Sequence, residues 1–88
     1  MVLSRTPYDR TKHGGGAPGF TREGWVFAVQ DMRGRFASEG ENLPFIGCGW
    51  GEHQDGADTV AWLKKQPWCN GSIGTIGASA GGITQNLL

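Results

Sequence analysis

Three short segments, separated by polar and glycine-rich stretches, predict the strands of a small sheet. The first covers residues 2–6 and ends at Pro7, which has no N–H to donate to a neighbouring strand. The second, residues 25–29 (WVFAV), is continuously apolar, which is typical of a parallel strand covered on both faces. A polar loop is predicted from Asp31 onward. Residues 73–76 (IGTI) form the third segment and predict the third strand.

The most strongly marked helix is predicted for residues 55–66 (DGADTVAWLKKQ). Asp55 is a candidate N-cap, two lysines occupy the last turn and Pro67 follows, so both ends carry helix-terminus signals. Spacings of three and four residues predict an apolar stripe on one face, formed by Ala57, Val60, Ala61 and Leu63 or Lys64. A single helical turn is predicted for residues 20–24.

A last helix is predicted from Ala80 to Leu88, with Ile83 and Leu87 on a shared face. Strands therefore alternate with helices, which is the order of βαβ units in a parallel sheet. We predict an α/β fold with parallel strands and βαβ crossovers. No internal repeat and no linker divides the 88 residues, so they form a single unit.

Composition and charge restrict the partners. The chain has 16 glycines, more than twice the usual share of about 7%, so many turns are expected. Eight basic and eight acidic residues cancel without any basic block, which argues against nucleic acid or an anionic membrane surface as the partner. A small neutral or mixed-charge molecule fits better.

The cysteines and the apolar segments bear on the compartment. Cys48 and Cys69 match no C-x-x-C pattern, and free thiols are favoured over one disulfide because nothing else indicates a secreted protein. The first residues lack the apolar core of a signal peptide, and no run approaches the roughly 18 apolar residues of a membrane span. A cytoplasmic location is therefore favoured.

Residues 77–81 (GASAG) match G-x-S-x-G, the spacing around the nucleophile of many serine hydrolases. A sharp turn between the third strand and the last helix would project the Ser79 hydroxyl from the backbone. Gly77 and Gly81 supply the smallness that such a nucleophile elbow needs, because strand and helix approach closely there. The five-residue motif is weak alone and gains weight from the predicted strand before it and helix after it.

Two other interpretations of these glycines stay open. Glycine and serine can form a tight turn with no chemical role, and a glycine-rich turn at a helix N-terminus can bind a phosphate. No Walker lysine accompanies Ser79. Residues 14–19 (GGGAPG) fit G-x-G-x-x-G, but they are separated from the preceding strand and contain Pro18, so we interpret them as a flexible loop.

Four segments in a fixed order add a more specific signal: residues 5–10 (RTPYDR), 29–41 (VQDMRGRFASEGE), 58–82 (DTVAWLKKQPWCNGSIGTIGASAGG) and 83–85 (ITQ). Together they resemble the catalytic α/β-hydrolase domain of the family that contains cocaine esterase, α-amino acid ester hydrolase and Xaa-Pro dipeptidyl-peptidase. The resemblance covers most of the chain. It implies hydrolysis of a small ester, amide or short peptide through a serine-bound acyl-enzyme, without a cofactor or a metal.

The resemblance also implies roles for individual residues. Ser79 matches the nucleophile, and in this family the tyrosine of the T-P-Y segment donates to the oxyanion beside the backbone N–H of the residue after the nucleophile. These positions are Tyr8 and Ala80, and one such donor is typically worth about 3 kcal/mol of barrier. Ala80 replaces a tyrosine frequent in the family, which removes a ring but keeps the N–H. Without the resemblance, Tyr8 would be interpreted as a strand-end aromatic packed on the core.

The D-x-R-G segment of the family is matched by three residues after the second strand, Asp31, Arg33 and Arg35. We interpret them as mainly structural, holding a loop at the carboxyl edge of the sheet through ion pairs and hydrogen bonds. A direct contact with substrate is the less favoured alternative.

The partners of a catalytic triad are missing. In α/β-hydrolases the acid and the histidine follow the nucleophile, but residues 80–88 contain no Asp, Glu or His. His13 and His53 precede Ser79 in polar, glycine-rich segments and are interpreted as loop residues. No His/Cys/Asp/Glu cluster has metal-ligand spacing. We therefore expect residues 1–88 to be a partial catalytic domain, truncated at both ends and inactive alone. The alternative is a non-catalytic remnant or binding module.

Overall fold

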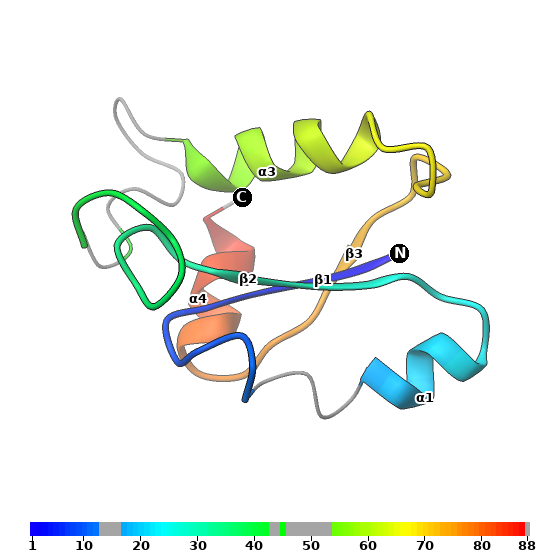
Figure 1. The fold of residues 1–88 in the computed structure, drawn as a ribbon, viewed down its shortest axis with the longest axis horizontal. Helices are drawn as coiled ribbons and strands as arrows, with labels where there is room; N and C mark the ends of the chain where they lie inside the picture. Colours follow the sequence, from blue (N-terminus) through cyan, green and yellow to red (C-terminus); the bar gives the residue numbers. More distant parts are fainter. Residues whose placement is uncertain (13–16, 43–44, 46–53, 88) are drawn as a thin grey trace.

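The computed structural model describes residues 1–12, 17–42, 45 and 54–87. Its elements are, in order, β1 (Val2–Thr6), α1 (Ala17–Arg22), β2 (Phe27–Asp31), α3 (Asp55–Lys64), β3 (Gly74–Thr75) and α4 (Ala80–Asn86). The strands form one parallel sheet in the order β2-β1-β3, so that β1 lies in the middle (Figure 1). The predicted α/β class with parallel strands is confirmed, and it fits a part of an α/β-hydrolase sheet.

The central strand β1 organises the sheet. It pairs with β2 along its whole length, from Val2 opposite Phe27 to Thr6 opposite Asp31. The much shorter β3 pairs only with the beginning of β1, where Gly74 lies opposite Val2. All five residues of β1 are buried, as expected for a strand with neighbours on both sides and helices over its faces.

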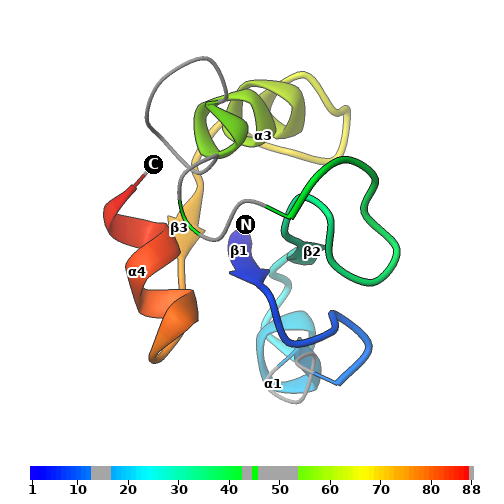
Figure 2. The same ribbon diagram turned by 90° about the vertical axis from the view of Figure 1, so that its left-hand side faces the viewer.

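The helices lie on opposite faces of the sheet. Leu63 of α3 is buried in one cluster with Met1 and Leu3, so α3 covers the face toward which Leu3 points. The ring of Phe20 in α1 lies 5.4 Å, between centroids, from the ring of Phe27, which points to the other face because side chains alternate along a strand. Figure 2 shows α3 and α1 on the two sides of the sheet, with α4 beside β3.

The second strand begins two residues later than predicted. The structure has Phe27–Asp31 in place of residues 25–29, and Asp31, predicted as the start of a loop, is the last residue of the strand. Trp25 lies outside the strand and is half exposed. The apolar run located a strand correctly, but pairing with β1 sets its limits. The third strand is at the predicted place and shorter, Gly74–Thr75.

The longest helix, α3, begins at the predicted residue and ends two residues earlier, at Lys64. Its N-cap is Gln54, not Asp55. The predicted stripe is wrong in part, because Ala57 and Ala61 are exposed whereas Gly56 and Leu63 are buried. A methyl side chain loses little by facing water, so the two alanines do not determine which face packs.

The last helix, α4, packs through a face that differs from the predicted one. Its buried residues are Ala80, Gly81 and Thr84, whereas Ile83 is 46% exposed. The Thr84 hydroxyl donates a hydrogen bond to the backbone oxygen of Arg5 in β1, 3.1 Å away. Small residues and this hydrogen bond therefore attach α4 to the sheet in place of a large apolar face. The first helix begins at Ala17, earlier than the predicted turn at residues 20–24.

Candidate active site

Ser79 occupies the turn between β3 and α4, where the sequence predicts a nucleophile elbow. It is the N-cap of α4, its side chain is exposed, and its backbone has φ 55° and ψ −120°. A positive φ is uncommon for a residue other than glycine, and such strained residues concentrate at functional sites. A strand-to-helix turn that strains a serine and leaves it exposed is what the predicted nucleophile elbow requires.

The two glycines of the elbow, residues 77–81, differ in what the structure requires of them. A Cβ atom added to Gly77 would lie 2.7 Å from the carbonyl carbon of Gly81 and 2.8 Å from its oxygen. A Cβ added to Gly81 would meet only the oxygen of Arg5, at 3.8 Å, which is ordinary contact. The close approach of the turn after β3 to the start of α4 therefore demands glycine at position 77 and leaves room for a methyl group at position 81.

The first turn of α4 leaves one donor available beside Ser79. The N–H groups of Gly82 and Ile83 donate to the backbone oxygen of Ser79, and that of Gly81 donates to the backbone oxygen of Ala78. Within the part of the chain that the structure describes, the N–H of Ala80 donates no hydrogen bond. Ala80 itself is buried, and only its backbone is suited to a chemical role.

The Gln85 side chain forms hydrogen bonds across the elbow, a role that was not predicted from the sequence. Its amide nitrogen donates to the backbone oxygens of Gly77 at 2.9 Å and Gly81 at 3.2 Å, while its amide oxygen accepts from the Thr75 hydroxyl at 2.9 Å. One side chain thus joins β3, the elbow and α4. The segment ITQ contributed to the resemblance, but nothing in its composition or spacing indicates this role.

Tyr8 lies two residues after the end of β1, at the same edge of the sheet as Ser79. Because β1 and β3 are neighbouring parallel strands, the turns at their carboxyl ends meet this edge together, as Figure 1 shows. The Tyr8 N–H donates to the Thr6 hydroxyl at 3.0 Å, and the Tyr8 side chain is 47% exposed. It is therefore not a fully buried core aromatic.

The end of β2 and the segment after it are held by ion pairs and hydrogen bonds, as predicted from the sequence. Asp31 pairs with Arg10 at 2.9 Å, and Arg35 donates to the Pro7 oxygen at 3.1 Å. Arg33 binds both carboxylate oxygens of Asp55, at 2.8 and 2.6 Å, a bidentate pair that joins the loop to α3. The hydrogen bond and the charge of Asp55 raise the pKa of the Arg33 guanidinium.

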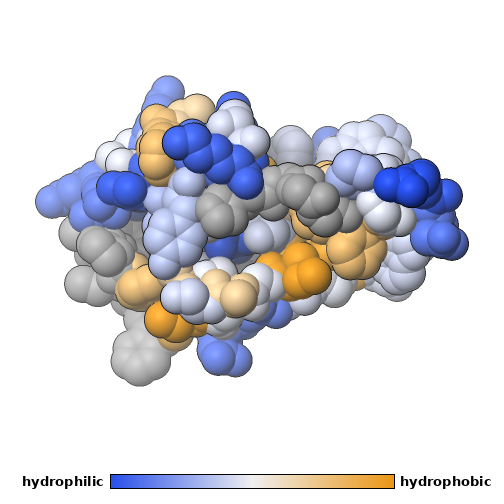
Figure 3. Space-filling view, turned by 90° about the horizontal axis from the view of Figure 1, so that it is seen from below, coloured by the Kyte–Doolittle hydropathy of each residue, from blue (hydrophilic) through white to orange (hydrophobic). Residues whose placement is uncertain are grey.

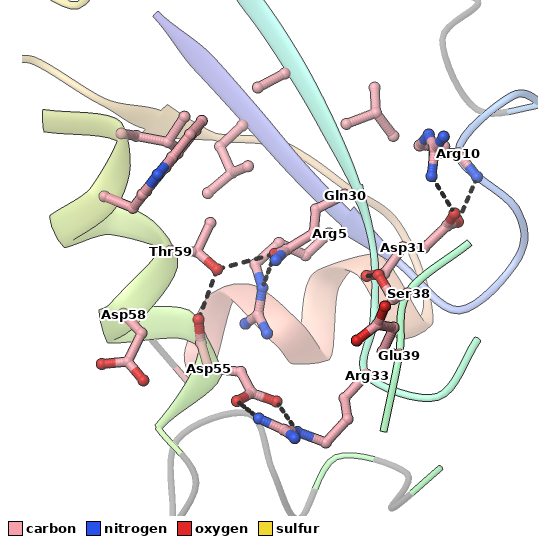
Figure 4. A pocket seen from close by; sticks show the side chains of 15 residues that line it. Arg5, Arg10, Gln30, Asp31, Arg33, Ser38, Glu39, Asp55, Asp58 and Thr59 are labelled. Atoms are coloured by element: carbon pink, nitrogen blue, oxygen red, sulfur yellow. Dashed lines mark hydrogen bonds and ion pairs between the residues drawn. The ribbon is translucent and has the colours of Figure 1, made fainter. Parts of the chain in front are cut away.

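A cavity of about 630 Å³ lies between α3 and the sheet (Figure 4). Its polar lining is largely engaged within the chain: Arg5 donates to Gln30 at 3.0 Å, and Gln30 accepts from the Thr59 hydroxyl at 3.1 Å. No residue of the elbow lines this cavity. This cavity and Ser79 thus lie in different places.

The structure describes only some of the other candidate groups. His13, His53, Cys48 and residues 14–16 lie outside the described residues, whereas residues 17–19, predicted as part of a flexible loop, belong to α1. Cys69 is a half-buried free thiol. Across residues 1–12, 17–42, 45 and 54–87, no three His, Cys, Asp or Glu side chains form a group that could hold a metal ion. No helix in the same ranges is long and apolar enough to cross a membrane.

Comparison with known proteins gives consistent relationships. The family model described as X-Pro dipeptidyl-peptidase (S15 family) matches residues 1–88. The cocaine esterase of a Rhodococcus species is 36% identical over 91 residues, covering 97% of this chain and 15% of that protein. Two proteins provisionally named serine esterases, from Mycobacterium bovis and Mycobacterium tuberculosis, are each 38% identical over 71 residues, covering 78% of this chain and 11% of theirs.

The chain spans about 15% or less of the length of these curated relatives. The names of the family and of the relatives confirm the resemblance drawn from the four sequence segments, and they indicate a hydrolase. The chain belongs to the X-Pro dipeptidyl-peptidase (S15) family.

Proposed function

We propose that residues 1–88 carry the nucleophile and the oxyanion donors of a serine hydrolase that cleaves esters or amides through an acyl-enzyme. The observation that carries the proposal is the backbone of Ser79, held at φ 55° at a strand-to-helix junction with Gly77 packed against Gly81. A turn without chemistry has no need to place an exposed, non-glycine residue in this conformation. Membership of the S15 family supports the same function.

In the proposed reaction, the Ser79 oxygen attacks the substrate carbonyl while a base accepts its proton. The new oxyanion receives hydrogen bonds from the Ala80 N–H and the Tyr8 hydroxyl. The leaving alcohol or amine takes a proton from the protonated base, and the acyl group remains on Ser79. Water then attacks the ester with help from the same base, which regenerates the serine.

The base and the carboxylate that orients it are proposed to come from a part of the polypeptide beyond these 88 residues. Residues 80–88 hold no Asp, Glu or His, and the usual order in this fold is serine, acid, histidine. Residues 1–88 alone are then expected to turn over poorly, because they hold the nucleophile and oxyanion donors without the group that activates the nucleophile. Acyl transfer of this kind requires no cofactor and no metal.

The proposed substrates are small esters, amides or short peptides. The relatives are named as esterases and the family as an X-Pro dipeptidyl-peptidase, so both bond types are candidates. Ile76 and Ile83, before and after the elbow in sequence, are 43% and 46% exposed, and apolar groups reach the surface of the face drawn in Figure 3. Exposed apolar groups of this kind suit contact with an apolar acyl group.

The test compares two serine variants of the full-length enzyme. Ser79→Ala is expected to lower kcat for a p-nitrophenyl ester or an Xaa-Pro p-nitroanilide on the order of 10⁶-fold. Ser72→Ala, at an exposed serine just before β3, is the control and is expected to keep full activity. Retention of activity by Ser79→Ala would refute the proposal. A full-length protein that hydrolyses neither substrate and forms no acyl-enzyme would favour the non-catalytic alternative.

A further inference from the structure

The turn that carries Tyr8, residues 7–10, is fastened on both flanks to the segment at the end of β2. On one flank, Arg35 Nε donates to the Pro7 oxygen at 3.1 Å. On the other, the Asp31 carboxylate accepts from the backbone N–H of Arg10 at 2.7 Å and from its guanidinium at 2.9 Å. These contacts join residues 21 to 28 positions apart, so they fix the turn against the sheet and not only within itself.

Both anchors are themselves held in place. The Asp31 side chain is 1% exposed, and its carboxylate also accepts from the Ala37 N–H at 3.3 Å. The Arg35 guanidinium lies 5.1 Å from the centroid of the Phe36 ring, a cation–π contact. A carboxylate buried with several donors has little freedom to move, so the two hydrogen bonds that it gives the turn are well defined.

We propose that Arg35 and Asp31 are positioning residues, which hold the backbone of Tyr8 so that its hydroxyl meets the oxyanion formed at Ser79. This inference rests on the proposed hydrolase function. An oxyanion donor must come within about 2.7–3.1 Å of the developing charge, and a misplacement of about 1 Å can cost about 10²-fold in rate. A phenol lies far from its own backbone, so a small rotation of the turn displaces the hydroxyl by more than the backbone moves.

Arg33 provides a matched control within the same segment. It is two residues from Arg35 and carries the same charge, but it binds Asp55 on α3, as Figure 4 shows, whereas Arg35 donates to the Pro7 oxygen of the Tyr8 turn. If the segment acted only as a structural brace, loss of either arginine would affect activity in the same way. If Arg35 acts through Tyr8, only Arg35 is coupled to Tyr8.

A double-mutant cycle in the full-length enzyme tests the coupling. Arg35→Ala is expected to lower kcat for a p-nitrophenyl ester about 10-fold, with KM changed less than about 2-fold. The reason is that the hydrogen bond from the Tyr8 hydroxyl to the oxyanion forms in the transition state. In the Tyr8→Phe background, where the hydroxyl is already absent, the same change is expected to lower kcat less than about 2-fold. Arg33→Ala is expected to give the same fold-change in both backgrounds. Arg35→Lys, which keeps a donor for the Pro7 oxygen, is expected to recover part of the rate.

Three results would overturn the inference. The first is an equal fold-change from Arg35→Ala with and without the Tyr8 hydroxyl, and the second is a Tyr8→Phe enzyme with unchanged kcat. If Arg35→Ala does not fold, the cycle is made with Arg35→Lys. The third result is then an equal fold-change in kcat from Arg35→Lys with and without the Tyr8 hydroxyl. Loss of activity in Ser79→Ala with additive Arg35 effects would leave the hydrolase proposal standing and remove only this inference.

Discussion

Replacement of Gly77 by alanine tests the close packing on which the elbow depends. The added Cβ would lie 2.7, 2.8 and 2.9 Å from the C, O and Cα atoms of Gly81, whereas ordinary contact begins at 3.4 Å. The backbone at Gly77, in the turn after β3, would therefore have to separate from that of α4 by about 0.7 Å, the difference between 3.4 and 2.7 Å. All three contacts are with backbone, so no rotamer change relieves them. Overpacking of this kind typically costs about 1–3 kcal/mol of stability.

Gly81→Ala is the matched comparison, with the expected effect of opposite sign. Its Cβ would lie 3.8 Å from the Arg5 oxygen, the position is helical, and alanine is favoured over glycine in a helix by about 0.8–1 kcal/mol. We expect Gly77→Ala to lower the melting temperature of the full-length enzyme and Gly81→Ala to leave it equal or higher.

Ester hydrolysis gives the second assay for Gly77→Ala. Displacement of Ser79 by a fraction of an ångström is expected to lower kcat about 10-fold or more, given a cost of about 10²-fold per ångström. The reasoning is refuted if Gly77→Ala is as stable and as active as the wild type, or if Gly81→Ala is the more damaging of the two.

Three further predictions concern the elbow and the Tyr8 turn. In calorimetry, Ser79→Gly should be more stable than Ser79→Ala by about 1 kcal/mol. Relief of the strained φ gains about 1–3 kcal/mol, which exceeds the cost of about 0.4–1 kcal/mol from the extra unfolded-state entropy of glycine. Equal stability of the two variants would show that the turn is unstrained. Gln85→Ala should lower the free energy of unfolding by about 1 kcal/mol and also lower kcat. An unchanged melting temperature in this variant would show that the hydrogen bonds from Gln85 to the elbow are dispensable. The side-chain and backbone hydrogen bonds of Thr11 lower the pKa of Asp9 below its ordinary value of 3.8. The stability that they contribute is therefore present at neutral pH and is lost only as the pH falls below 3.8. NMR titration should show a higher Asp9 pKa in Thr11→Val, and an unchanged pKa would contradict this assignment.

The sequence predicted those features that depend on local chemistry. Pro7 ended β1 at the expected place, because proline cannot continue the ladder. The acidic start at Asp55 placed the beginning of α3 correctly. The small residues around Ser79 implied a sharp turn, and the structure has one there with a positive φ. Each of these signals acts over a few residues and needs no knowledge of the rest of the fold.

Features that depend on distant partners were not predictable from the same patterns. The limits of β2 follow from its pairing with β1, which an apolar run cannot specify. Asp55 was predicted as the N-cap of α3, but the N-cap is Gln54 and Asp55 binds Arg33, 22 residues earlier in the chain. Ile83 was expected to pack and faces outward, because Thr84 attaches the helix through a hydrogen bond to β1. A helical periodicity gives the apolar positions but not the hydrogen bonds that select the buried face.

Active-site labelling tests the central claim, that Ser79 is the nucleophile of a hydrolase, most directly. The full-length protein is treated with a fluorophosphonate, which reacts with activated serines, and the modified peptide is identified by mass spectrometry. We expect one fluorophosphonate adduct, on Ser79, which is absent in Ser79→Ala and retained in Ser72→Ala. An adduct on a different serine would contradict this claim. So would complete inhibition of ester hydrolysis by the fluorophosphonate while Ser79 stays unmodified.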